Sequence, residues 1–290
     1  MSMKIVISGA TGELGGSIVL DLCKRFPQAY ILAFGRDEEK LALLREKIKK
    51  SFPDRQWPVF VTQGQKISKN DTDPNGDIST EQDRNKIFNA IEKRLGGVDM
   101  YINTIGLYKS DSKLDVKSAQ ELRETNFTSN ASFTEELISR FSDGKTPLVI
   151  ADIGTIGAVA ELVKKPLEGT TIYGESKARL VEHTMNLAKN HENVFARIVH
   201  PGPFGASAQK IADEFGDCWA MKTEDVANFS LDLFFAPSKE KIVQGIICAE
   251  PHFFWGHIGD IDMLGIEGLT MTHSFKVRKK KSMFLVRKDK

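Results

Sequence analysis

Short apolar runs alternate with segments of helical periodicity along most of the chain. Nearly every position in these runs is apolar, as expected for strands that are buried on both faces. The alternation predicts an α/β fold, in which a parallel sheet is covered on both faces by helices. Thr223 is the expected N-cap of the last helix. We expect strands at 3–8, 30–34, 59–62, 98–103, 147–152, 194–199 and 241–249, and helices at 14–26, 37–50, 80–95, 114–141, 173–190 and 223–235.

The composition is typical of a soluble globular protein. The chain has 290 residues, of which 41% are hydrophobic and 27% charged, and no linker divides it into two domains. A net charge of +1 gives no reason to expect nucleic acid or anionic lipid as a partner. A polar stretch at 63–76 indicates a loop. Basic residues crowd the end of the chain, where a solvated tail and docking to a sister subunit or an acidic partner both remain open: Lys276, Arg278, Lys279, Lys280, Lys281, Arg287, Lys288 and Lys290.

The cysteines and the N-terminus bear on the cellular compartment. Cys23, Cys218 and Cys248 are isolated and odd in number, so neither a disulfide framework nor a zinc site is expected. The chain enters a predicted strand within a few residues, which leaves no room for a signal peptide, and no apolar stretch could span a bilayer. We therefore expect a cytoplasmic protein without a metal.

A glycine-rich turn, Gly9-Ala10-Thr11-Gly12-Glu13-Leu14-Gly15, follows the first predicted strand and opens the first predicted helix. This is the context of a dinucleotide fingerprint, because glycines let the backbone approach a pyrophosphate and a helix N-terminus favours its charge. A tight turn without a ligand remains the alternative.

Gly35-Arg36 follows the second predicted strand, where a dinucleotide site commonly has an acidic residue for the ribose hydroxyl. The planar cation of Arg36 suits a 2′-phosphate, so NADP(H) is favoured and NAD(H) remains possible. Asp37 could be the missing carboxylate shifted by one position, or the N-cap of the next helix.

Tyr173 and Lys177 lie in the run Tyr173-Gly174-Glu175-Ser176-Lys177. Residues four apart share one face of a helix, so the Lys177 ammonium can stabilise a Tyr173 phenolate and lower its pKa from about 10. Such a phenol can exchange a proton with a substrate oxygen near neutral pH. Together with a bound dinucleotide, the pair indicates a hydride-transfer enzyme.

The order of these motifs resembles the short-chain dehydrogenase/reductase family from about Lys4 to Ala249. The resemblance implies a single doubly wound Rossmann domain at 1–250 and leaves 251–290 as a C-terminal extension with a basic tail. It is carried by the Gly9 turn, Gly35-Arg36, Asp77-Ile78, Asn103-Thr104-Ile105-Gly106, Asn126, Tyr173 with Ser176 and Lys177, and Pro201-Gly202-Pro203.

The resemblance also implies site residues. Asn126 looks like the family's catalytic asparagine, which would kink its helix and hold a water that relays protons to Lys177. The segment 204–221 has the position of a lid over the substrate. Asp77 would bond the adenine, and Asn103 would line the adenosine side or brace the sheet. The cofactor-binding residues implied are Gly9, Thr11, Gly12, Glu13, Leu14, Gly15, Arg36, Asp77, Ile78, Asn103, Gly106, Tyr173, Lys177, Pro201 and Gly202.

Two positions depart from the common family pattern. Thr155 stands where the serine that polarises the substrate carbonyl is expected, and its hydroxyl can donate the same bond or can belong to a structural turn. Thr170 or Thr171 could substitute for it. Glu13 replaces a glycine, and the Gly9, Gly12, Gly15 spacing is nearer the extended subgroup, which contains epimerases and dehydratases.

The residues and the resemblance together predict an NADP(H)-dependent oxidoreductase that interconverts a carbonyl and an alcohol, with Asn126, Thr155, Tyr173 and Lys177 as catalytic residues. A cofactor-binding sensor or scaffold, and an epimerase or dehydratase, are the alternatives. His200 is a second acid/base or a structural histidine. The resemblance implies a homodimer or homotetramer that pairs helices around 118–141 and 173–190.

Overall fold

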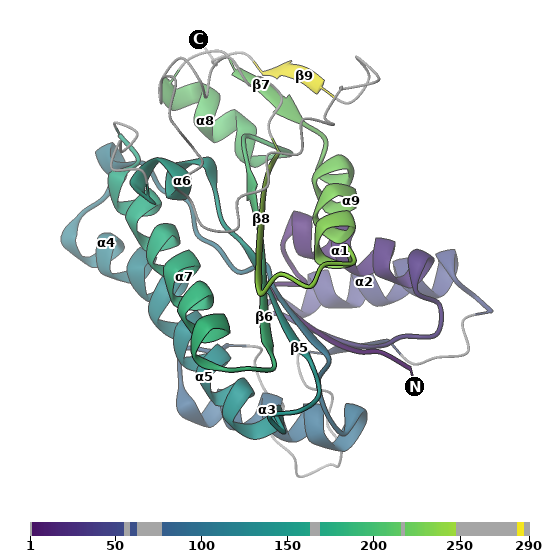
Figure 1. Cartoon of the computed structure of the whole chain (residues 1–290). Helices are drawn as coiled ribbons and strands as arrows, with labels where there is room; N and C mark the ends of the chain where they lie inside the picture. Colours follow the sequence, from purple (N-terminus) through teal and green to yellow (C-terminus); the bar gives the residue numbers. More distant parts are fainter. Residues whose placement is uncertain are drawn as a thin grey trace.

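A computed structural model describes residues 2–54, 59–62, 77–162, 169–215, 218–247 and 283–286. Within these ranges, seven parallel strands form one sheet in the order β3-β2-β1-β4-β5-β6-β8 (Figure 1). The predicted doubly wound α/β fold is confirmed. The strands are β1 (Lys4–Ser8), β2 (Tyr30–Phe34), β3 (Val59–Thr62), β4 (Met100–Asn103), β5 (Leu148–Ile153), β6 (Val194–Pro201) and β8 (Ile242–Ile247).

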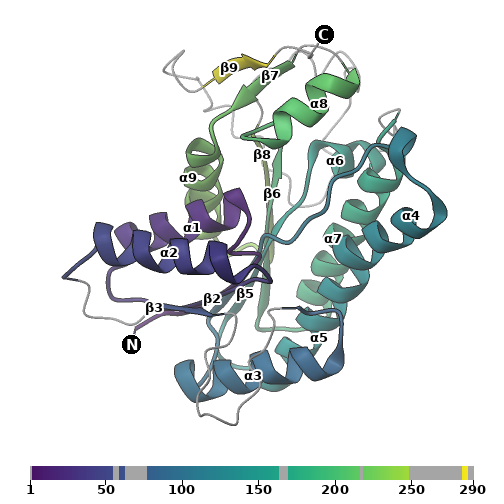
Figure 2. The same ribbon diagram turned by 180° about the vertical axis from the view of Figure 1, so that it is seen from behind.

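Helices cover both faces of the sheet, as Figures 1 and 2 show from opposite sides. One face carries α1 (Glu13–Arg25), α2 (Glu38–Ser51) and α9 (Thr223–Phe234), and the other carries α3 (Glu81–Leu95), α4 (Val116–Arg123), α5 (Ser129–Phe141) and α7 (Thr171–Asn190). Alternate strand residues enter separate cores on the two faces: Ile5 and Ile7 lie in one core, and Val6 lies in the other. Burial on both faces explains why the strands are apolar throughout.

The helix predicted at 114–141 is interrupted. A π-helical turn, Glu124–Thr128, separates α4 from α5 and contains the buried Asn126. The resemblance implied a kink at this residue, and the π turn lies at this place in the helix. Two short helices that the sequence did not predict, α6 (Ile156–Leu162) and α8 (Ser207–Phe215), lie near the carboxyl ends of the strands (Figure 1).

A second, antiparallel sheet pairs β7 (Cys218–Met221) with β9 (Met283–Val286). It brings part of the predicted C-terminal extension back to the segment predicted as a lid (Figure 1). The basic residues of the tail, the polar stretch 63–76 and residues 248–282 lie outside the described residues. The division into 1–250 and 251–290 therefore stays a prediction.

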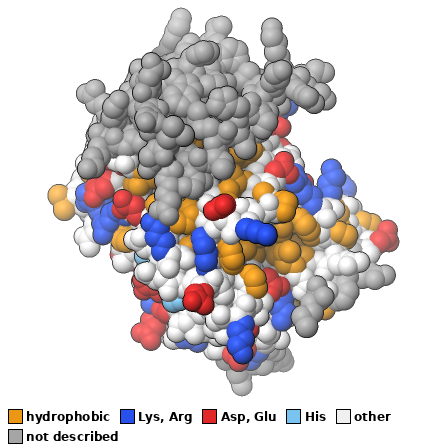
Figure 3. Space-filling view, in the orientation of Figure 1, with side chains coloured by type: hydrophobic (Ala, Val, Ile, Leu, Met, Phe, Trp, Pro, Cys, Tyr) orange, Lys and Arg blue, Asp and Glu red, His pale blue; other side chains and the backbone are white. Residues whose placement is uncertain are grey.

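The surface of the described part carries both signs of charge. Basic and acidic side chains are interspersed on the face shown in Figure 3, in keeping with the net charge of +1. Among the helices that the structure describes, none is both long and apolar enough to cross a membrane.

Candidate active site

The parallel register places the carboxyl ends of the central strands side by side. Ser8 of β1 lies opposite Asn103 of β4, Asn103 lies opposite Asp152 of β5, and Ile153 lies opposite Val199 of β6. The loops that follow these strands therefore begin at one edge of the sheet. In open α/β sheets this edge is where ligands bind.

The glycine turn after β1 is tightly closed. Gly9 has φ +75°, and its carbonyl accepts a hydrogen bond from the Gly12 amide at 2.9 Å. A Cβ on Gly9 would lie 2.6 Å from Thr104 Oγ1, and one on Gly15 would collide with the Gly9 carbonyl oxygen. Leu14 is 6% exposed, and its side chain belongs to the core beneath the turn.

The same turn leads directly into α1, which begins at Glu13. The first amides of a helix have no intrahelical acceptor, and they favour an anion. Gly35 brings the end of β2 against the turn, because a Cβ there would lie 2.6 Å from Thr11 Cγ2. The turn thus fits the diphosphate of a dinucleotide.

Arg36 and Asp37 follow β2, and Arg36 is exposed. The Asp37 carboxylate accepts a hydrogen bond from the Lys40 amide at 3.1 Å and pairs with Lys40 Nζ at 3.3 Å. The backbone bond from Lys40 lowers the pKa of Asp37 below its usual value. Asp37 is therefore the N-cap of α2, which was one of its two predicted roles.

Asp77 and Ile78 lie just before α3. Asp77 Oδ1 accepts a hydrogen bond from the Ser79 amide at 2.9 Å, and Ile78 is 4% exposed. The Ile78 carbonyl accepts a bond from Arg84 at 3.0 Å. Contact of this pair with an adenine stays a prediction.

Asn103 braces three strands from a position that is 1% exposed. Its Oδ1 accepts bonds from Ser8 Oγ at 3.0 Å and from the Ile105 amide at 3.1 Å, and its Nδ2 donates to Asp152 Oδ1 at 2.8 Å. Bracing was one of its two predicted roles, and contact with a nucleotide stays a prediction.

Asp152 is a buried carboxylate at the end of β5. It also accepts a hydrogen bond from the Thr184 hydroxyl of α7. Burial raises the pKa of Asp152, while its hydrogen bonds and the charge of Lys177 oppose that rise. This network ties α7 to the edge of the sheet.

Lys177 is 3% exposed and reaches into the edge from α7. Its Nζ donates to the carbonyl oxygens of Ile105 at 3.0 Å and Ile153 at 3.1 Å. Burial lowers the pKa of Lys177 to about 8, and the nearby Asp152 carboxylate opposes this shift. A Cβ on Gly106 would lie 3.2 Å from Nζ, so the chain passes close to the ammonium there.

Tyr173 lies one helical turn before Lys177 and packs edge-on against Tyr108, with ring centroids 5.1 Å apart. Burial raises the pKa of Tyr173, and Tyr108 adds to the rise. The prediction that Lys177 lowers this pKa is wrong for this structure. Helical spacing places both side chains on one face, but the ammonium is turned toward two backbone carbonyls.

Asn126 faces Lys177 across Gly106, since a Cβ on Gly106 would lie 3.9 Å from Asn126 Oδ1. Its Oδ1 accepts a bond from the Leu107 amide at 2.7 Å, and its Nδ2 donates to the Leu107 carbonyl at 2.9 Å and to Ser176 Oγ at 3.1 Å. The π turn therefore fixes the loop after β4 against α7.

Thr155 follows β5, and its Oγ1 accepts a hydrogen bond from the Ala158 amide at 2.9 Å, which caps α6. Its carbonyl oxygen lies 3.3 Å from Nδ1 of His200. His200 is fully buried, and Nε2 lies 2.8 Å from Gln244 Oε1. Burial lowers the pKa of His200.

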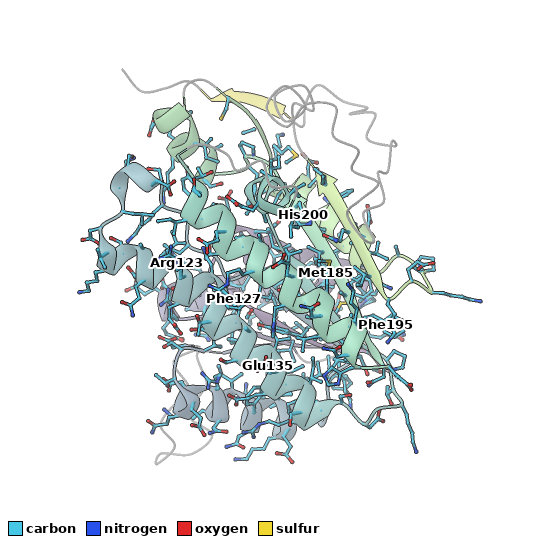
Figure 4. All side chains as sticks on the ribbon, turned by 60° about the vertical axis from the view of Figure 1, so that its left-hand side comes forward. Arg123, Phe127, Glu135, Met185, Phe195 and His200 are labelled. Atoms are coloured by element: carbon cyan, nitrogen blue, oxygen red, sulfur yellow. The ribbon has the colours of Figure 1, made fainter. Side chains whose placement is uncertain are left out.

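The contacts of His200 support the structural role among its two alternatives. His200 lies near the carboxyl end of β6 and Phe195 near its amino end, and Figure 4 shows the two residues well apart. At this end Pro201 pairs with Ile247, and the Gly202 amide donates to the Ile247 carbonyl at 2.8 Å. Pro201 thus ends β6 and Gly202 begins the loop that follows; contact of the two residues with a cofactor stays a prediction.

Sequence reasoning assigned no role to Tyr108, Asp152, Thr184 or the hydroxyl of Ser176. Asp152 was detectable as an acidic residue at the end of an apolar run, but its partners come from distant elements. In the part of the chain that the structure describes, no group of His, Cys, Asp and Glu could hold a metal ion.

The family model for short chain dehydrogenases matches residues 3–214. The chain belongs to the short-chain dehydrogenase/reductase family. Farnesol dehydrogenase from Aedes aegypti is 22% identical over 241 residues, which cover 82% of this chain and 91% of that protein.

Solved structures share the fold of this short-chain dehydrogenase/reductase. An alcohol dehydrogenase from the archaeon Thermococcus sibiricus, complexed with 5-hydroxy-NADP, has a TM-score of 0.64 at 14% identity, with 85% of this chain and 96% of that one covered. A 3-ketoacyl-(acyl-carrier-protein) reductase from Brucella melitensis, complexed with NADH, has a TM-score of 0.65 at 16% identity, with the same coverage of 85% and 96%.

The buried ammonium of Lys177 generates a pH-dependent stability. The pKa of Lys177 is about 8 in the folded protein, against an ordinary 10.5. At a pH between these two values the unfolded chain binds a proton that the native side chain has lost. The free energy of unfolding must then rise with pH, by about 2–3 kcal/mol from about pH 8 to about pH 10. Denaturant unfolding across this range should show the rise in the native protein and not in Lys177→Met. Lys145→Met, at an exposed lysine, is the control; equal slopes for the native protein and Lys177→Met would contradict the burial of a titrating amine.

Proposed function

We propose that the protein is an NADP(H)-dependent oxidoreductase that interconverts a carbonyl and an alcohol. The observation that carries this proposal is the position of Lys177. Its ammonium lies between the ends of β4 and β5, beside Gly106, with Tyr173 one turn away on the same helix. Membership of the short chain dehydrogenase family supports the same reaction class.

The cofactor would be held by residues along the carboxyl edge of the sheet. The glycine turn and the start of α1 suit its diphosphate, Arg36 suits a 2′-phosphate, and Lys177 can bond the nicotinamide ribose. When bound, the nicotinamide supplies or accepts the hydride, and the protein supplies position and electrostatics.

Tyr173 would act as the general acid in the direction of reduction. The phenol is protonated at neutral pH and can give its proton to a substrate oxygen, while the rise of its pKa on burial makes it a weaker acid in the absence of substrate. Lys177, with a pKa of about 8, is mostly protonated at pH 7, so its ammonium can donate to the nicotinamide ribose. Asn126 would complete the proton relay, as the family resemblance implies.

Thr155 would orient the substrate oxygen. The Ala158 amide already donates to Oγ1, so the hydroxyl hydrogen can be directed to another acceptor. The cap also restricts the side chain, which is stiff at χ1 because threonine is β-branched. A fixed hydroxyl at the end of β5 can polarise a carbonyl before proton transfer.

The choice of NADP(H) over NAD(H) would rest on Arg36. Asp37, the rival for a ribose hydroxyl, is engaged by Lys40 as a helix cap. Arg36→Ala should weaken NADPH binding by about 1.5–3 kcal/mol, the usual range for a hydrogen bond to a charged group, and leave NADH binding nearly unchanged. Equilibrium titration with both nucleotides measures this. Equal losses, or tighter binding of NADH by the native protein, would contradict the NADP assignment.

Tyr173→Phe should retain the pocket and lose the proton donor. Turnover in a panel of aldehydes and ketones, followed by NADPH absorbance, should fall by about 10²–10⁴-fold with little change in NADPH affinity. Tyr108→Phe removes the neighbouring phenol and is the control, expected to stay far more active. Native turnover in Tyr173→Phe would refute the mechanism and favour the cofactor-binding sensor.

Thr155 can be tested with a pair of substitutions. Thr155→Ser keeps the hydroxyl, and we expect it to retain activity, whereas Thr155→Val keeps the shape and should lose about 10²-fold or more in kcat. Steady-state kinetics with the same substrate measures both. Similar activity in the valine and serine variants would show that the hydroxyl has no part in the reaction.

We also propose a homodimer or homotetramer that pairs α5 and α7, as the family resemblance implies; a cytoplasmic location likewise stays a prediction. On this side of the molecule the Arg179 guanidinium lies 4.3 Å from the ring centroid of Phe127, and Figure 4 shows Arg123, Phe127 and Glu135 beside α7. Light scattering at micromolar concentration should give a multiple of the 32.3 kDa chain mass, and Phe127→Glu should lower it. A monomeric mass for the native protein would refute this assembly.

A further inference from the structure

Glu13, the residue that departs from the common glycine pattern, connects three distant segments. Its Oε2 accepts a hydrogen bond from the Ala206 amide at 2.9 Å, and its Oε1 accepts one from the Thr223 hydroxyl. Ala206 lies in the loop after β6, and Thr223 is the first residue of α9. Thr223, the predicted N-cap, therefore directs its hydroxyl to Glu13, and Lys222 is the N-cap residue of α9.

Gly205 makes this approach possible. It has φ +52°, a region that favours glycine, and a Cβ there would collide with both the Glu13 carboxylate and the Thr223 hydroxyl. The Gly205 amide donates to the Met221 carbonyl at 3.1 Å, and the Met221 amide donates to the Pro203 carbonyl at 3.0 Å. The loop is thus held between Glu13 and β7.

The position of Glu13 also favours its charge. It is the first residue of α1, and it contacts the first residue of α9, so its carboxylate lies at the N-terminal ends of two helices. Both helix dipoles stabilise an anion there. The backbone and hydroxyl donors add charge-assisted hydrogen bonds.

We propose that Glu13 is a positioning residue that fastens the loop 203–206 to the glycine turn, so that dinucleotide binding and the order of α8 are linked. The loop leads directly into α8, the helix in the segment predicted as a lid. A dinucleotide bound at the glycine turn would stabilise the segment that carries Glu13 and, through its two hydrogen bonds, the ordered state of α8. Because such coupling is reciprocal, an ordered α8 would strengthen dinucleotide binding by the same factor. The nucleotide half of this inference rests on the proposed function.

Two substitutions separate the effect of the hydrogen bonds of Glu13 from the effect of its charge. Glu13→Gln keeps an acceptor for the Ala206 amide and can donate to the Thr223 oxygen, whereas Glu13→Ala removes both bonds. Both variants lack the negative charge that would repel a diphosphate. Any difference between them therefore reports the hydrogen bonds alone.

Hydrogen exchange on the full chain, with and without NADPH, tests the inference. Peptides across 206–215 should exchange about tenfold faster or more in Glu13→Ala than in the native protein, and Glu13→Gln should exchange like the native protein. NADPH should slow exchange there in the native protein and in Glu13→Gln but not in Glu13→Ala. Glu13→Gln should also bind NADPH about fivefold or more tightly than Glu13→Ala.

Glu81→Gln is the matched control, because Glu81 is an exposed acid at the first position of α3; it should behave like the native protein. Native exchange in Glu13→Ala, or equal NADPH affinity of the two Glu13 variants, would overturn the inference. If Glu13→Ala does not fold, Thr223→Val removes one of the two bonds, and native exchange in that variant would overturn it equally. Absence of NADPH binding to the native protein would refute the proposed function. Hydrogen exchange across 206–215 without nucleotide would still decide whether Glu13 fastens the loop 203–206.

Discussion

The ammonium of Lys177 joins the carboxyl ends of β4 and β5 to helix α7. It donates to the Ile105 and Ile153 carbonyls from a side chain that is 3% exposed. Asp152, one residue before Ile153, accepts hydrogen bonds from Asn103 and from Thr184 of α7, so it helps to position that helix. Its carboxylate also lies near the ammonium and raises the pKa of Lys177. Because α7 is fixed at this point, Tyr173 is held beside Tyr108 at the edge of the sheet.

A buried ammonium has a desolvation cost, and two carbonyls and a nearby carboxylate only partly offset it. The lowered pKa of Lys177 and the raised pKa of Tyr173 both come from this burial. Residues with pKa values perturbed by burial and a specific charged partner cluster at functional sites. The glycine turn begins at the same edge of the sheet, where it packs so closely against Thr104 that a side chain on Gly9 or Gly15 would collide with it. Under the proposed function, this edge would combine an anion site with a proton donor.

Much of the fold followed from periodicity, because the strands are buried on both faces and are therefore apolar throughout. Capping chemistry also identified Asp37 as an N-cap candidate. Features that depend on distant contacts were not predictable. The pairing of β7 with β9 joins segments far apart in the sequence, and the contacts of Asn126 with Leu107 and Ser176 lie at the π turn. The pKa of Tyr173 was mispredicted because helical spacing shows which side chains share a face and not where an ammonium points.

We expect the carboxyl edge of this sheet to bind NADPH in contact with Lys177. The most direct measurement is an equilibrium titration of the full chain with NADPH, followed by nucleotide fluorescence, for the native protein and for Lys177→Ala. We expect saturation at one nucleotide per chain, with a dissociation constant between about 1 μM and about 1 mM, the usual range of KM values, and clearly weaker binding by Lys177→Ala. An absence of saturable binding to the native protein, or equal affinity in the two proteins, would contradict it.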